Sequence, residues 1–93
     1  MLRLTDLLDL GETLNLQLLE YKGELDVENQ YGEPYKRYHY TFTDKLGREI
    51  EHKATDHQHR FYLKNYRKGD WISAEADDYV KNKLQFKHFT PII

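Results

Sequence analysis

Aromatic and polar side chains alternate in YHYTFTDKLGREI, residues 38 to 50, and this pattern constrains the fold more than any other stretch of the chain. Tyr38, Tyr40 and Phe42 occupy every second position, which is the side-chain period of a β-strand. The segment DKLGR that follows fits a three-residue hairpin loop in which Gly47 adopts the left-handed conformation. The stretch therefore predicts a β-hairpin.

The turn also determines which residues share a face of this hairpin. One face is aromatic and aliphatic, and its cross-strand pairs are Phe42 with Ile50, Tyr40 with His52 and Tyr38 with Ala54. The other face is polar and consists of Arg37, His39, Thr41, Glu51 and Lys53. Burying such charges without partners would cost on the order of several kcal/mol each. We therefore expect the rings to be inside and the polar face to be outside, where it is available for function.

A long strand is predicted over residues 13–28, where apolar and polar residues alternate. The apolar residues change parity between Leu18 and Leu19, as in a β-bulge, and Gly23 lets the strand bend sharply. We expect this strand to curl from one sheet into another. The apolar residues on the first parity are Leu14, Leu16 and Leu18, and those on the second are Leu19, Tyr21, Leu25 and Val27.

The other predicted strands run from about 35 to 43, from 71 to 76 and from 83 to 90, with a loop at 28–34. The inward residues of the last two strands are Ile72, Ala74, Ala76, Leu84 and Phe86, with the side of His88 left open.

Two helices complete the predicted pattern. Thr55 and Gln58 form a capping box, which predicts a helix from there to about Tyr66. A shorter helix is predicted within residues 2–10, with Thr5 as its N-cap and Gly11 as its stop, leading into the domain.

Length and composition limit the class of protein. A chain of 93 residues, 39% hydrophobic and 32% charged, fits one globular domain with a single modest core. It has no cysteine, so disulfides, thiolate metal sites and thiol nucleophiles are excluded. No apolar run approaches the roughly 18 residues that span a bilayer, and acidic residues stand where a signal peptide would be apolar. We expect a cytoplasmic protein without a membrane partner.

The charge is unevenly distributed along the chain, although the net charge is only −2. Residues 1–34 carry eight acids and two bases, whereas residues 35–72 carry nine bases, five acids and four of the five histidines. Because phosphate binding depends on local potential, one face can hold a polyanion despite the negative total. These bases could equally be ordinary solvated charges.

Two stretches resemble a known family. YTFTDKLGREIEHKA looks like the strand-turn-strand hairpin of OB-fold domains of the replication protein A and anticodon-binding kind, and NYRKGDWISAEAD resembles their entry into strand four. The resemblance covers residues 13–90. It implies an all-β fold, a five-stranded Greek-key barrel with one helix between strands three and four. The chain would then be one domain, residues 1–93, with residues 1–12 as a helical lead-in.

The resemblance also implies a function. OB-folds of this kind mostly bind single-stranded DNA or RNA across strands two and three and the loops that flank them. In this chain the corresponding surface would include Thr41. The Trp71 ring, on the outward side of strand four, would extend that surface. The predicted nucleic-acid-binding residues are Tyr31, Tyr35, Arg37, His39, Lys53, Trp71, Tyr79, Lys81 and Lys83. We expect binding of single-stranded DNA with little sequence preference, as in the accessory proteins that phages and mobile elements encode, with RNA left open.

A protein-binding role is the alternative, because Glu51 interrupts the basic surface. The chain would then be an OB-fold adaptor that contacts a replication-protein partner in a replication or transfer complex. A homodimer anchored by Trp71 or Phe89 is also open. We expect no metal, since His57 and His59 would lie about 200° apart on a helix without a third ligand. We also expect no cofactor and no enzymatic activity, since the only serine, Ser73, is predicted within a strand and no catalytic triad or carboxylate pair is evident.

Overall fold

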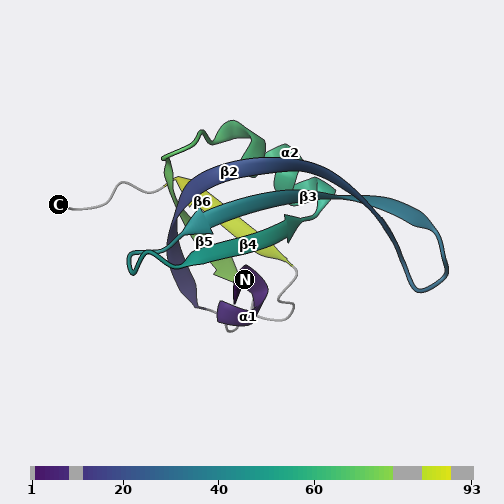
Figure 1. Ribbon diagram of the computed structural model, residues 1–93, viewed down its shortest axis with the longest axis horizontal. Helices are drawn as coiled ribbons and strands as arrows, with labels where there is room; N and C mark the ends of the chain where they lie inside the picture. Colours follow the sequence, from purple (N-terminus) through teal and green to yellow (C-terminus); the bar gives the residue numbers. More distant parts are fainter. Residues whose placement is uncertain (1, 9–11, 77–82, 89–93) are drawn as a thin grey trace.

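A computed structural model describes residues 2–8, 12–76 and 83–88, which form a six-stranded sheet curled into a half-barrel (Figure 1). The strand order across the sheet is β1-β4-β3-β2-β5-β6. The strands are β1 (Leu2–Arg3), β2 (Thr13–Glu28), β3 (Pro34–Thr43), β4 (Glu49–Ala54), β5 (Trp71–Ala76) and β6 (Leu84–His88). The helical elements are α1 (Leu4–Leu7), α2 (Asp56–Phe61) and the 3-10 helix η1 (Leu63–Asn65). The predicted β-rich fold class is confirmed.

Strand β2 joins the two halves of the sheet, and Figure 1 shows it arching across the molecule. It pairs with β5 along residues 13–17 and with β3 along residues 17–28. The predicted irregularity is confirmed, because the register with β3 shifts between Leu18 and Glu20. A second shift between Tyr21 and Gly23 was not predicted.

The second shift separates residues that the sequence analysis placed on one face. Tyr21 lies opposite Tyr40 on the inner side of the sheet. Leu25 instead lies opposite Arg37, and Val27 opposite Tyr35, on the outer side. The prediction of one common face was wrong because each extra residue in a bulge reverses the side on which all later side chains point.

The hairpin of β3 and β4 has the predicted register. Phe42 pairs with Ile50, and the pairing continues in step to the end of β4. Gly47 has a φ of 77°, and the Asp44 backbone N–H donates to the Arg48 carbonyl. The Asp44 carboxylate accepts the backbone N–H groups of Leu46 and Arg48 as well as the Arg48 guanidinium. Burial alone would raise the pKa of Asp44, but the bonds from Arg48 and Leu46 hold it below its ordinary value.

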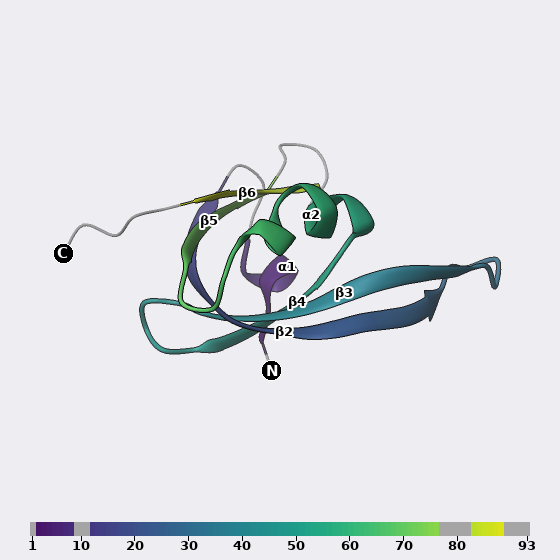
Figure 2. The ribbon, with the colours of Figure 1, turned by 90° about the horizontal axis from the view of Figure 1, so that it is seen from above.

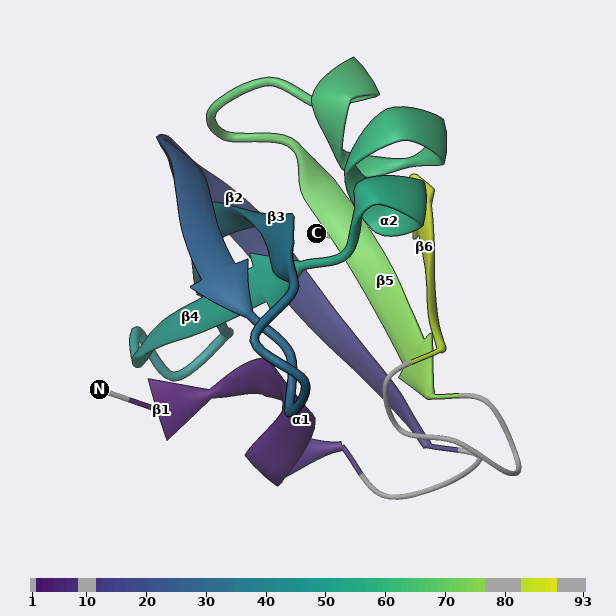
Figure 3. The same ribbon diagram turned by 90° about the vertical axis from the view of Figure 1, so that its right-hand side faces the viewer.

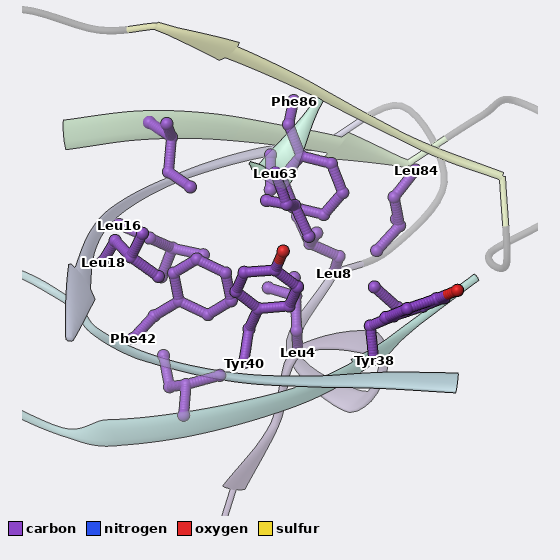
Figure 4. Close-up of a cluster of buried hydrophobic side chains, with 14 of the residues drawn as sticks. Leu4, Leu8, Leu16, Leu18, Tyr38, Tyr40, Phe42, Leu63, Leu84 and Phe86 are labelled. Atoms are coloured by element: carbon purple, nitrogen blue, oxygen red, sulfur yellow. The ribbon is translucent and has the colours of Figure 1, made fainter. Parts of the chain in front are cut away.

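The core fills the space inside the curled sheet. Figure 4 shows Tyr40 and Phe42 pointing from β3 into the space below Leu63 and Phe86, with Tyr38 farther along the same strand and its ring turned to the side. In Figure 2, α2 and α1 lie between the β2-β3-β4 layer and the β5-β6 layer, and Figure 3 shows them covering different ends of the space. The inward residues predicted for the hairpin and the last two strands are all buried, namely Tyr38, Tyr40, Phe42, Ile50, His52, Ala54, Ile72, Ala74, Ala76, Leu84 and Phe86.

The helix after β4 begins as predicted and ends earlier. The Thr55 side chain accepts the Gln58 backbone N–H, and the Gln58 side chain accepts the Thr55 N–H, which completes the capping box. The chain leaves α geometry at Tyr62 and continues as a 3-10 turn. This turn buries Leu63 and brings the Tyr66 hydroxyl to the Phe86 carbonyl, so the predicted continuous helix was wrong.

The N-terminal segment also departs from the prediction. Among the described residues 2–8, only residues 4–7 are α-helical, and Thr5 is inside this helix rather than at its N-cap; Gly11 lies outside the described residues. Residues 2–3 instead form β1, which pairs parallel to β4. The predicted count of five strands was therefore wrong. The OB-fold remains a prediction, because the described strands form one sheet with β1 and β6 at its edges rather than a closed barrel.

The far end of the β2–β3 hairpin projects from the body as a two-stranded arm (Figure 2), formed by residues 24–37. Within the described residues, β5 pairs with β2 only up to residue 17, and β4 pairs with β3 only from residue 38. The Asn29 side chain stabilises the turn at the tip by accepting the backbone N–H groups of Tyr31 and Glu33. None of the described helices is both long and apolar enough to cross a membrane.

Candidate nucleic-acid interface

Three cationic side chains from three different strands surround one hollow. This outer hollow has a volume of about 280 Å³, and its lining includes Arg3 on β1, Arg37 on β3 and Lys53 on β4. Tyr35 and Glu51 also line it. The outer hollow therefore combines three positive charges, one negative charge and one aromatic ring.

Strand pairing brings these residues together. Arg3 is the register partner of Glu51 in the parallel β1–β4 pair, and Lys53 lies opposite His39 in the β3–β4 pair. The Arg37 guanidinium carbon lies 5.4 Å from the centroid of the Tyr35 ring. This distance is typical of a cation–π contact, which orders both side chains before any ligand arrives.

Glu51 reduces the positive charge of this surface, as its sequence position indicated. Its Oε2 lies 3.3 Å from Nε2 of His39, and both side chains are about one-fifth exposed, at 21% and 19%. His39 Nε2 has no hydrogen-bond partner among the described residues, so the two side chains are in contact without a hydrogen bond.

His52 and Gln58 contribute a neutral, buried part of the lining. His52 Nε2 lies 2.7 Å from Gln58 Oε1, an acceptor, so this nitrogen carries the proton. Burial lowers the pKa of His52 to about 4. At neutral pH this imidazole adds no charge, and the potential in the outer hollow comes from the side chains at its rim.

The structure brings together only part of the predicted set. Tyr35, Arg37 and Lys53 line the outer hollow, and His39 lies beside it. Tyr31 is 77% exposed at the tip of the arm. Thr41 was expected on the exposed face but is buried and donates to the Glu20 carbonyl, because the bulged part of β2 covers it.

The remaining predicted residues lie elsewhere. Trp71 pairs with Gln17, which pairs with Thr43. Thr43 is six positions from Arg37 along β3, a separation of about 20 Å, so the half-buried Trp71 is not beside the outer hollow. Lys83 is exposed immediately before β6, which is the sheet edge opposite β1 and β4 in the strand order. Tyr79, Lys81 and Phe89 lie outside the described residues.

Sequence reasoning missed Arg3. The sequence predicts a helical lead-in for residues 1–12. A strand of only two residues carries no periodic signal, so the pattern does not reveal β1. Its place depends on the parallel pairing of Leu2 with Ile50 and of Arg3 with Glu51, which connects segments almost 50 residues apart.

No protein-family model, curated protein or solved structure matches this chain. Among the residues that the structure describes, no three His, Cys, Asp or Glu side chains are grouped closely enough to hold a metal ion. The function must therefore be argued from the geometry and charge of the surfaces themselves.

Proposed function

We propose that this protein binds single-stranded nucleic acid, DNA in the first place, with little sequence preference. The observation that carries this proposal is the convergence of Arg3, Arg37 and Lys53 on one hollow beside the Tyr35 ring. Single strands are held by this combination, because cations contact phosphates while aromatic faces stack on bases of any identity. We also propose that the chain has an OB-fold, because of the order of its strands along the chain and the helix that follows β4.

Rigid positioning supports this proposal. Each of the three cations stands on a paired strand, because Arg3 pairs with Glu51, Lys53 pairs with His39, and Arg37 pairs with Leu25 at the base of the arm. Tyr35 is 41% exposed and already lies against Arg37, so less side-chain entropy is lost when a base stacks on it. The negative charge of Glu51 beside these cations limits the affinity for phosphate.

Fluorescence anisotropy with a labelled oligothymidine of roughly 15 nucleotides tests the proposal. Binding should weaken with salt by a log-log slope of about −0.7 for each phosphate contacted. A double reversal, Arg37→Glu with Lys53→Glu, should reduce binding to all sequences alike and reduce the slope. Tyr35→Ala should weaken binding by about 1 to 3 kcal/mol with little change in the slope, because stacking releases no counterions.

The matched control is Lys45→Glu with Lys87→Glu, which makes the same change in net charge at two exposed positions outside the outer hollow. It should bind nearly as well as the unmodified protein. An RNA of the same sequence tests the preference for DNA, and a duplex of equal length should bind less well because its bases are already stacked. Equal losses in the two double variants would mean that only the total charge matters, and would contradict a site at the outer hollow.

The arm favours a second function, that of a protein-binding adaptor. Glu24, Asp26 and Glu28 alternate along one face of β2, and among the described residues the only cation paired to them is Lys36, whose Nζ lies 2.8 Å from Glu24. A two-stranded ribbon with this acidic face would repel phosphates and attract a basic protein segment. If neither DNA nor RNA binds at about 50 mM salt, the adaptor becomes the better proposal, with a lysine-rich peptide as the first probe of the arm.

A further inference from the structure

Four aromatic rings form a ladder on the inner side of the sheet, where β2, β3 and α2 meet. The rings of Tyr38 and His59 are parallel, with centroids 3.9 Å apart. The Tyr21 ring lies 4.8 Å from that of Tyr40 and 5.5 Å from that of His59. Tyr40 and His59 share a hydrogen bond of 2.5 Å, and the Tyr38 hydroxyl donates to Asp56 at 3.2 Å. These contacts hold all four rings in fixed orientations.

Tyr21 is the outermost ring of the ladder. Its side chain is 44% exposed, whereas Tyr40 behind it is buried. A hollow of about 310 Å³ adjoins these rings, which is at the lower end of the range for small-ligand pockets. We call it the ring site, and its lining includes Tyr21, Tyr40, His59, Leu63, Lys64, Lys68 and the acidic Glu20.

Charges of both signs surround the ring site. The exposed Lys64 and Lys68 line it on the side of η1 and the segment that follows, and Glu20 lines it on the side of β2. Burial lowers the pKa of His59 and the positive charges of Lys64 and Arg60 lower it further, whereas the negative charges of Asp56 and Glu24 act in the opposite sense. An anionic group would therefore be attracted to the side of the two lysines and repelled from the side of β2.

We propose that the ring site binds a nucleotide, with its base stacked on Tyr21 above the buried Leu63 side chain and its phosphate at Lys64 and Lys68. A ring that is already supported by other rings and still open on one side loses little entropy when a base stacks on it. This inference goes beyond the proposed function, because Tyr21 pairs with Tyr40 on the inner side of the sheet whereas Arg37 is on the outer side. The nucleotide is free or is one unit of a single strand.

Titration with AMP, followed by NMR, tests the proposal. AMP should shift the signals of Tyr21, His59 and Leu63 in a saturable manner. Tyr21→Ala should weaken AMP binding by roughly 5- to 100-fold, whereas Tyr21→Phe, which keeps the ring, should leave it within about twofold. Because Tyr21 is nearly half exposed, the alanine variant should keep the dispersed amide spectrum of the folded protein.

The phosphate contact is tested separately with adenosine, which lacks that group. Lys64→Gln combined with Lys68→Gln should weaken AMP binding by roughly 2- to 10-fold and leave adenosine binding unchanged. The matched control, Lys45→Gln with Lys87→Gln, should affect neither ligand. Absence of saturable shifts, shifts confined to Arg3 and Arg37, or an unchanged affinity in Tyr21→Ala would each overturn the proposal.

Competition distinguishes the two sources of the nucleotide. An oligothymidine that displaces AMP and shifts the same Tyr21 and His59 signals would identify a unit of a single strand as the ligand. An oligothymidine that binds without displacing AMP would identify the free nucleotide. AMP binding without any oligonucleotide binding would support the ring site and contradict the proposed function. Failure of the ring site and failure of the proposed function therefore give different results.

Discussion

Strands β2 and β3 pass through two environments, the body of the molecule and the arm. In the body, β2 lies between β5 and β3, and β3 lies between β2 and β4. Leu16 and Phe42 there are completely buried. In the arm the same two strands pair only with each other among the described residues, and Leu25 and Val27 are half-buried on its outer side.

The comparison shows what an alternating pattern can establish. Leu16 and Leu18 alternate with polar residues just as Leu25 and Val27 do. The pattern identifies a strand with one apolar face in each case, but it does not show whether another layer covers that face. The difference arises from the elements packed against the body, chiefly β5, β6 and α2. Stability should therefore be concentrated in the body and should decline along the hairpin.

Phe42→Ala should have the largest effect on stability. Removing a fully buried ring leaves a cavity, at a cost of about 3–5 kcal/mol, which is a large part of the stability of so small a protein. Urea unfolding followed by circular dichroism measures the change. A loss below about 1 kcal/mol would contradict the position of Phe42 in the core.

The stability of the body should also depend on pH. The pKa of His52 is about 4 in the folded protein and 6.5 ordinarily, so the unfolded chain binds the proton more readily. Stability is complete above pH 6.5 and should decrease as the pH falls toward 4, by about 3 kcal/mol in all. Urea unfolding across this range measures it. His52→Gln should flatten the curve, with the remaining slope due to His59, whose pKa burial also lowers.

The capping box should contribute less than the core. Thr55→Ala removes the acceptor for the Gln58 backbone N–H and should cost about 1–2 kcal/mol. Thr55→Ser keeps the hydroxyl and should be nearly neutral. Thermal unfolding of the two variants distinguishes loss of the cap from loss of the side-chain methyl group, and equal destabilisation would contradict a role for the hydroxyl.

A matched pair of leucine substitutions in β2 tests the comparison directly. Leu16→Ala in the body should cost about 2–5 kcal/mol, whereas Leu25→Ala in the arm should cost only about 0.5–1 kcal/mol. Amide hydrogen exchange should agree, with the arm exchanging through local opening and β3 beside β4 through global unfolding. Equal costs for the two variants would show that the arm is packed as tightly as the body.

Parts of the candidate surfaces were accessible to prediction and parts were not. Arg37 and Lys53 were expected on one face of the hairpin from the register that the turn at Asp44 sets, and both line the outer hollow together with Tyr35. Arg3 was missed because its place depends on β1. The aromatic ladder of Tyr21, Tyr38, Tyr40 and His59 was not predicted. The spacing of residues along a helix does not show which side of α2 faces the tyrosines of β3.

By itself, the sequence determined the local features of this protein. The hairpin register, the left-handed Gly47, the capping box at Thr55 and the first bulge in β2 each depend on residues that are close along the chain. Short segments encode these features because turns and caps satisfy their own backbone hydrogen bonds. The predictions of these four features were confirmed, whereas the N-cap predicted at Thr5 and the end of the helix after Thr55 were wrong.

Only the tertiary structure decided the features that join distant segments. The sixth strand, the second bulge, the burial of Thr41 and the uncovered faces of the arm depend on which segments pack together. The physical reason is that packing free energy comes from surfaces that distant residues form jointly, so no single segment carries the information. Both proposed sites are of this kind, since each is assembled from strands and turns that meet only in the folded chain.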